Sequence, residues 1–207
     1  KVEMSFRIED KYLINQIDYI KVKKLLQKNN FKETYEKRLI TSLYFDNKFL
    51  SMFHDSEEGV VPRKKIRFRY YNNDKSKIFF EFKINSVEGK FKRSEKISLK
   101  DFNNFCIKGK HDPSYGVCLP KLYVNYLREY FATKDLRITI DKEINFKSHR
   151  GVLKVKENFY ILEIKTLNFL KNIEFLEGFP NTKIRYSKYS EGIKKIFISD
   201  QNNRIFN

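Results

Sequence analysis

Residues 65–70 read Lys-Ile-Arg-Phe-Arg-Tyr and residues 80–83 read Phe-Glu-Phe-Lys, so apolar and charged side chains alternate in both stretches. Successive side chains on a β-strand point to opposite faces of the sheet, which gives a pattern with period two. The two stretches therefore predict strands that carry their charges on one face and their apolar side chains on the other.

The same spacing of charges at i and i+2 recurs in four other segments of the chain. These are Arg7-x-Glu9-x-Lys11, Arg137-x-Thr139-x-Asp141, Glu163-x-Lys165 and Lys183-x-Arg185. A single strand of this kind would mean little, but six predict a sheet. We expect its apolar face to pack against helices and its charged face to line a groove or a closed barrel.

Hydrophobic periodicity and turn residues place further elements along the chain. We expect a loop at residues 108–120, where two glycines and two prolines cluster. Helices are predicted at residues 15–30, 48–54, from 99 onward, 121–131 and 190–198. Strands are predicted at residues 4–13, 39–45, 64–71, 77–84, 90–99, 135–142, 152–156, 158–165 and 183–186.

The composition sets the broad class of the protein. The 207 residues suit one domain, residues 1–207, and carry a formal charge of +17, which favours polyanionic partners. Lysines on the predicted helices account for part of this charge as a solvated surface. The sequence has no membrane-spanning run and no signal-peptide pattern, and Cys106 and Cys118 lack metal-type spacing. We therefore expect a cytoplasmic protein with reduced thiols.

A sheet face with this many cations cannot be buried empty, because an unpaired buried charge costs several kcal/mol. One interpretation is that water and anions fill the space beside the charged face. The alternative is that the face is exposed to solvent and carries alternating ion pairs. The carboxylates of the same face suit salt bridges or the coordination of Mg²⁺ or Mn²⁺. They belong to Glu9, Glu81, Asp141 and Glu163.

Eight short motifs in a fixed order resemble the VTC domain, the polyphosphate polymerase module of the triphosphate tunnel metalloenzyme (CYTH) superfamily. The resemblance runs from about residue 5 to residue 195. It implies an α+β fold, in which a closed antiparallel β-barrel of about eight strands is flanked by helices. The motifs are Arg7 to Tyr12, Ser42 to Asn47, Lys65 to Tyr70, Phe80 to Lys83, Lys92-Arg93, Leu136 to Asp141, Leu162 to Lys165 and Tyr186 to Tyr189.

The resemblance also implies roles for individual residues. Glu163 matches the family's metal-binding glutamate, and the metal would be Mn²⁺ or Mg²⁺. The expected catalytic residues, which hold the triphosphate, are Arg67, Arg69, Lys83, Arg137 and Lys188. The expected substrate-binding residues are Lys11, Lys92, Lys165, Arg185, Glu9 and Glu81. The phase of the strand with Lys92 is the least defined, because Arg93 and Lys96 are also basic.

One position departs from the superfamily pattern Glu-x-Glu-x-Lys, because Arg7 stands where the first glutamate is expected. This favours the polymerase branch, which would transfer the γ-phosphate of ATP to a growing inorganic polyphosphate chain. The alternatives are a non-catalytic module that binds polyphosphate or nucleotide, and a metal-dependent tripolyphosphatase or nucleoside triphosphatase. Regulation and product export would need other chains, including a membrane-protein partner. Nucleic acid is the least favoured ligand, because Phe68 and Phe80 lie opposite the charges.

Overall fold

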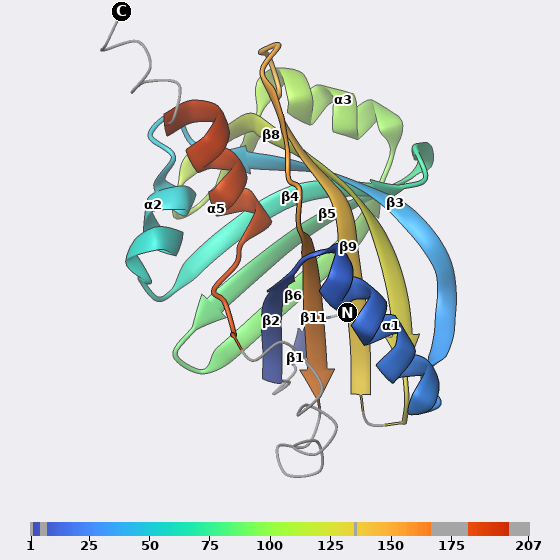
Figure 1. Cartoon of the computed structure of the whole chain (residues 1–207). Coiled ribbons are helices and arrows are strands. Elements are labelled where there is room, and N and C mark those ends of the chain that lie inside the picture. The colour runs from blue at the N-terminus through green and yellow to red at the C-terminus, as the bar shows by residue number, and fades with distance from the viewer. Residues whose placement is uncertain (1, 5–7, 135, 167–181, 199–207) are drawn as a thin grey trace, which may run out of the picture.

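The computed structural model describes residues 2–4, 8–134, 136–166 and 182–198. One large, strongly curled sheet dominates the structure, and helices lie on its outside and at one end (Figure 1). The helices are α1 (Gln16–Lys28), α2 (Ser51–Glu58), α3 (Leu99–Lys108) and α5 (Lys188–Ile193), and a π-helical turn, η1 (Lys194–Ile198), continues α5. The strands are β1 (Val2–Met4), β2 (Ile8–Ile14), β3 (Lys32–Asp46), β4 (Arg63–Tyr71), β5 (Asp74–Ser86), β6 (Gly89–Ile97), β7 (Lys110–Asp112), β8 (Gly116–Ala132), β9 (Leu136–Ser148), β10 (Lys154–Lys156) and β11 (Tyr160–Thr166).

All strand pairs of the sheet are antiparallel, as expected. The main order is β1-β6-β5-β4-β3-β8-β9-β11-β2, with β10 added to β9 and β7 added to β8. The described residues thus form an 11-stranded sheet rather than the expected one of about eight strands. The α+β class is confirmed.

The expectation of a closed barrel is wrong for the described residues, because β1 and β2 stand at the two ends of the strand order and do not pair. Met4 pairs with β6, and Ile8 pairs with β11. Four residues of extended chain span at most roughly 14 Å. The two edges of the sheet are therefore held near one another by the chain itself, although no hydrogen-bonded ladder joins them.

Two hydrophobic clusters hold helices against the sheet. Helix α1 begins where Asn15 and Asp18 cap each other's backbone N–H groups, and it buries Val22 and Leu26. These side chains pack on the outer face of β2, β9 and β11, with Ile138 and Leu162 among their neighbours. The other cluster joins α2, α3 and α5 to the remaining strands. The apolar phase of the strands is therefore covered by helices, as the alternation predicts.

Helix α2 begins three residues later than expected, at Ser51. Asp46, at the end of β3, accepts hydrogen bonds from the backbone N–H groups of Met52 and Phe53, at 3.1 and 3.0 Å. The hydroxyl of Tyr189 also donates to Asp46, at 2.5 Å. Asp46 thus caps α2 across a short turn and ties it to α5.

The predicted helix at residues 121–131 is wrong, because this segment belongs to strand β8. Leu122, Val124 and Tyr126 are buried while the residues between them are less so, which is the period of a strand. Backbone pairing to β3 and β9 on both sides overrides the helical spacing of the apolar residues. The predicted loop at residues 108–120 is also wrong for most of its length, because it contains β7 and the beginning of β8.

The C-terminal elements differ partly from the expectation. Instead of a strand at residues 183–186, the structure has an isolated bridge between Lys183 and Tyr12. The final helix is split into α5 and the π-turn η1. Cys106 and Cys118 are free thiols, as expected. Among the described residues, no helix combines the length and the apolar character that a membrane span requires.

Candidate functional site

The charged strand residues converge on the concave face of the curled sheet. Arg69 of β4 reaches past β3 to donate a hydrogen bond to the hydroxyl of Tyr126 on β8, at 3.1 Å. Lys83 of β5 interacts electrostatically with Glu9 of β2 and with Glu163, although β2 and β5 are far apart in the strand order. We call the concave face that carries these charges the cationic lumen. It is lined by Lys11, Lys65, Arg67, Arg69, Lys83, Lys92, Arg128, Lys165, Lys188, Glu9, Glu81, Asp141 and Glu163.

Glu81 is the centre of the first charge cluster in the lumen. Its carboxylate accepts from Nε of Arg67 at 2.7 Å and pairs with Lys92 at 2.7 Å. Arg69 approaches the same carboxylate to 3.7 Å. Burial by itself would raise the pKa of Glu81, but these cations hold it well below its usual range. The cluster therefore remains ionised across the physiological pH range.

Asp141 forms the second cluster with a residue that the sequence analysis did not identify. Arg128 of β8 lies opposite Asp141 of β9 and donates from Nε and Nη2, at 2.5 and 2.7 Å. Lys188, at the start of α5, contacts the same carboxylate at 2.5 Å. Burial opposes the charged form, yet the pKa of Asp141 is lowered because Arg128 and Lys188 stabilise the carboxylate.

Glu163 is the carboxylate of the third cluster, on β11. It pairs with Lys165 at 2.8 Å, and Arg128 lies 3.6 Å away. Burial would raise its pKa, but Lys165, Arg128 and Lys11 hold the pKa of Glu163 well below the ordinary value. Glu9 on β2 lies beside this cluster, 3.5 Å from Lys11. Arg128 therefore links the second cluster to the third.

Two lysines of the lumen carry depressed pKa values. Burial, together with the positive charge of Arg67, lowers the pKa of Lys83 to about 7. Burial likewise lowers the pKa of Lys65 to about 8, and its ammonium group donates to Ser187 at 2.7 Å. The side chain of Lys83 is exposed to solvent. Protein groups on the concave face of the sheet nevertheless lie around its ammonium group, and they lower its pKa. Both ammonium groups would be stabilised by an anion in the lumen.

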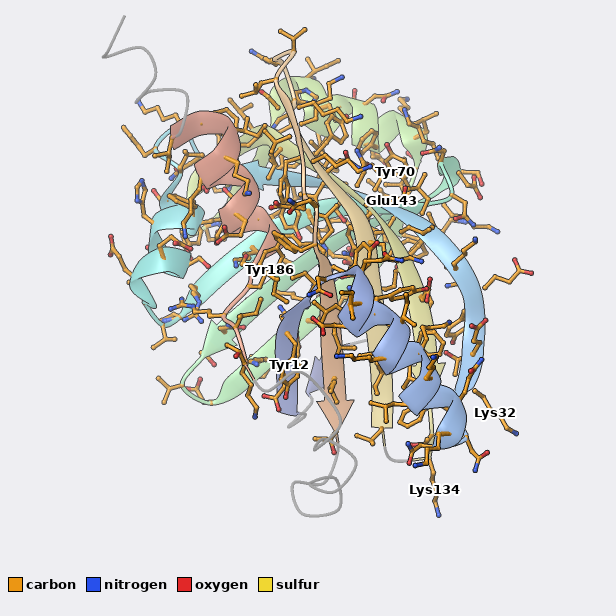
Figure 2. The ribbon with its side chains drawn as sticks, viewed as in Figure 1. Tyr12, Lys32, Tyr70, Lys134, Glu143 and Tyr186 are labelled. Carbon is orange, nitrogen blue, oxygen red and sulfur yellow. The ribbon has the colours of Figure 1, made fainter. Side chains whose placement is uncertain are left out.

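One end of the lumen is closed by α5 and by the segment that leads into it. Tyr189 stacks on Tyr44, with ring centroids 5.0 Å apart, and Gly192 lies directly against Leu122. Lys11 donates to the carbonyl of Tyr186 at 2.9 Å, so the leading segment is fixed to β2. Figure 2 shows Tyr186 on the segment that leads into α5. The charged residues thus lie beside the contacts that Tyr189 and Gly192 of α5 make with the sheet.

Two of the expected site residues lie outside these clusters. Arg137 is exposed, opposite Lys165 in the β9–β11 pairing, and makes no ion pair with a described residue. It shares the inward phase of Asp141 and lies near the start of β9. Arg185 donates to the carbonyl of Ser56 in α2 and therefore does not join the carboxylate clusters.

The uncertain phase of β6 is resolved by its contacts. Lys92 points inward to Glu81, whereas Arg93 pairs with Glu95 on the opposite face, at 3.8 Å. The expected assignment of Lys92 to the charged face is confirmed. Arg128 and Lys65 were not among the site residues predicted from the sequence. The alternation of Leu122, Val124, Tyr126 and Arg128 could have revealed Arg128, had the segment been read as a strand.

The lumen carries a surplus of positive charge. Among the described residues, nine cationic side chains line the lumen with four carboxylates, so the cations outnumber the carboxylates by five. Two like charges at about 4 Å repel by roughly 4 kcal/mol at an effective dielectric constant near 20. A phosphate chain among these side chains would remove that repulsion. The space is therefore suited to a linear polyanion.

The donor set also fits a divalent cation held together with phosphate. Mg²⁺ commonly takes one or two protein carboxylates and completes its shell with substrate phosphates and water. Glu163 supplies an ionised carboxylate, and Thr139, opposite it in register, has a buried hydroxyl without a hydrogen-bond partner. No group of three His, Cys, Asp or Glu side chains in the described part of the chain could hold a metal alone. Phosphate oxygens would have to complete the site.

A strongly curled antiparallel sheet, with helices outside and charged side chains on its concave face, defines the fold class of this protein. The sequence pattern of the VTC domain matches residues 6–116 and 113–197, so the chain belongs to the VTC domain family. No curated protein matches the chain in sequence.

Solved structures of low sequence identity share the fold. A candidate adenylate cyclase from Bacillus halodurans is 14% identical, with a TM-score of 0.62 over 95% of this chain and 98% of its own. A candidate adenylyl cyclase from Hippeastrum, described as having a dominant triphosphatase activity, is 15% identical, with a TM-score of 0.57 over 91% of this chain and 95% of its own. At these identities the similarity establishes the fold alone.

Proposed function

We propose that this protein is a metal-dependent polyphosphate polymerase, which transfers the γ-phosphoryl group of ATP to a growing inorganic polyphosphate chain. The observation that carries the proposal is the surplus of cations in the lumen. The excess of five cations over carboxylates matches a substrate and a product that both carry one negative charge or more per phosphate. Family membership supports the same reaction class.

The chemistry needs no nucleophilic side chain. A terminal oxygen of the polyphosphate chain attacks the γ-phosphorus of ATP, a new P–O–P bond forms, and the β–γ bridge breaks to release ADP. Phosphoryl transfer depends chiefly on positioning and on stabilising negative charge. His54, His111 and His149 lie outside the lumen, on α2, β7 and the end of β9. This arrangement agrees with a reaction in which phosphate itself attacks.

The cations of the lumen divide into two groups in this proposal. Arg67, Arg69, Lys83 and Lys188, with Arg128 beside them, would bind the triphosphate and neutralise the oxygens of the transferred group. Lys11, Lys92 and Lys165 would guide the polyphosphate chain, together with Arg137, which is exposed outside the charge clusters. Glu163 would hold Mn²⁺ or Mg²⁺, which supplies Lewis-acid stabilisation of the phosphate oxygens when bound.

The direct test is to incubate the purified protein with ATP and Mn²⁺ or Mg²⁺ and to resolve the products on a gel stained for polyphosphate. We expect chain growth, with Glu163→Gln and Arg67→Ala each lowering turnover at least about ten-fold, the loss expected when a charged contact to the transferred group is removed. Arg93→Ala, on the outer face, is the matched control and should retain activity. Release of orthophosphate without chain growth would instead establish a hydrolase. Tight binding without turnover would establish a binding module.

A further inference from the structure

An aromatic cluster surrounds one arginine of β3. The guanidinium carbon of Arg38 lies 4.4 Å from the ring centre of Tyr35, 5.7 Å from that of Tyr130 and 5.9 Å from that of Tyr71. Tyr35 and Tyr130 also meet edge to face, at 5.5 Å. None of these residues belongs to the three charge clusters. The proposed phosphoryl transfer leaves the aromatic cluster without a role.

The cluster stands at the rim of the cationic lumen. Arg38 has the inward phase of Ser42 and Tyr44 on β3, and Tyr71 has the phase of Arg69 on β4. Strand β3 pairs with β4 only from Ile40 to Phe45, so Arg38 lies beyond the end of that pairing. Figure 1 shows β3 continuing past the β4–β5 hairpin.

The cluster is connected to the charged residues through Tyr130. Tyr130 lies opposite Thr139 and interacts electrostatically with Arg128, Arg38 and Tyr71. Arg128 in turn binds Asp141 in the second charge cluster. A ligand that contacts the aromatic rings could therefore place its phosphates against the lumen cations.

The guanidinium of Arg38 has no carboxylate partner within the part of the chain that the structure describes. It is half-buried and makes no hydrogen bond or ion pair with any described residue. Its planar face contacts rings, while its N–H groups remain available. Tyr35 is 50% exposed, so a broad aromatic surface remains accessible next to this cation. A ligand with both an aromatic face and hydrogen-bond acceptors would satisfy both groups.

We propose that Tyr35 and Arg38 bind the base of the substrate nucleotide at the rim, with Tyr71 and Tyr130 supporting the guanidinium. This inference rests on the proposed use of a nucleoside triphosphate. Bases stack readily on tyrosine rings and on guanidinium planes, with little preference among bases. The triphosphate would then extend past Tyr130 toward Arg128 and Arg69. Inorganic polyphosphate has no aromatic face and would not use the rings.

The test compares the binding of two ligands to the wild type and to two variants of Tyr35. Binding of ATP and of inorganic tripolyphosphate is measured calorimetrically, without divalent metal, for the wild type, Tyr35→Ala and Tyr35→Phe. Loss of one base-stacking contact corresponds to about five-fold to about a hundred-fold weaker binding. We expect Tyr35→Ala to weaken ATP binding within that range and to change tripolyphosphate binding by less than about two-fold. Tyr35→Phe keeps the ring and should bind ATP as the wild type does.

An unchanged ATP affinity in Tyr35→Ala would refute the base site, as would an equal loss for both ligands. Failure of the wild type to bind tripolyphosphate would overturn the proposed function itself, and the base site with it. Folding of the variants is checked by thermal unfolding, since Tyr35 is half-exposed and its truncation removes little buried surface.

A spectroscopic test is available because the chain contains no tryptophan. Tyr35→Trp places a single tryptophan in the cluster, and its emission can be excited apart from that of the tyrosines. Phe49→Trp places one on the surface between β3 and α2, where Phe49 is 68% exposed. We expect ATP to change the emission of Tyr35→Trp at concentrations at which tripolyphosphate does not, and neither ligand to affect Phe49→Trp. Equal responses of Tyr35→Trp to both ligands would contradict base stacking.

Discussion

Arg128 and Asp141 face each other across β8 and β9 and form a two-point ion pair with distances of 2.5 and 2.7 Å. Asp141 is fully excluded from solvent. An arginine fork matches a carboxylate in two places, so the guanidinium is fixed in orientation. Because Arg128 also lies 3.6 Å from Glu163, the pair positions a cation between two carboxylates of the lumen.

Removal of Arg128 should therefore be costly for stability. Arg128→Met leaves Asp141 buried with Lys188 as its remaining partner, and we expect a loss of about 3–5 kcal/mol in the free energy of unfolding. Chemical denaturation at pH 7 measures it. Arg93→Met is the control, because the Arg93–Glu95 pair is exposed and should contribute less than about 1 kcal/mol. A similar small loss for both variants would show that the buried pair does not stabilise the fold.

Lys92 and Arg93 are adjacent cations on opposite faces of β6, which makes them a matched pair. Lys92→Ala removes a lumen cation, and we expect about ten-fold weaker binding of tripolyphosphate, equivalent to about 1.4 kcal/mol. Arg93→Ala should leave the affinity unchanged while altering the net charge equally. Calorimetric titration at constant ionic strength distinguishes them. Equal effects would mean that the affinity reflects overall charge rather than the lumen.

Lys83 should make ligand binding dependent on pH. Its pKa in the free protein is lowered to about 7, so most of the ammonium is deprotonated at pH 8. A polyanion favours the charged form and raises this pKa, so binding at pH 8 takes up protons and weakens as pH rises above 7. Calorimetry in buffers of different ionisation enthalpy counts the protons.

Lys83→Arg provides the reference for this measurement, because arginine stays charged throughout the range. The difference between the wild type and this variant separates the protons taken up by Lys83 from those of Lys65 and of the ligand. Identical proton uptake in both proteins would show that Lys83 does not face the bound phosphates.

Gly192 should be intolerant of any side chain. A Cβ atom there would lie 2.4 Å from Cδ2 of Leu122 and 2.7 Å from Cδ1 of Phe146, both buried. We expect Gly192→Ala to lower the free energy of unfolding by about 1–3 kcal/mol through overpacking. Combining it with Leu122→Ala should cost less than the two single changes together, because the truncated side chain leaves room. Additive costs in thermal or chemical unfolding would argue against this contact.

Much of the architecture was predictable from local patterns. The alternation in residues 65–70 and 80–83 predicted β4 and β5 with the correct inward face, and Asn15 with Asp18 marks the start of α1. The segment around Arg128 was misassigned, because apolar residues at mixed spacing fit a helix until backbone partners on both sides select a strand. The helix wrongly predicted at residues 121–131 and the failure to identify Arg128 therefore have the same origin.

By itself, the sequence determined which side chains share a face, because the two-residue period of a strand is a local property of the backbone. It therefore identified the inward set that contains Arg67, Glu81 and Glu163. Only the tertiary structure decided which charges meet. The pairing of Arg128 with Asp141, and the proximity of Lys83 to Glu9, depend on strand register and on the curl of the sheet. Register and curl arise from contacts between segments distant in sequence, which no local pattern specifies.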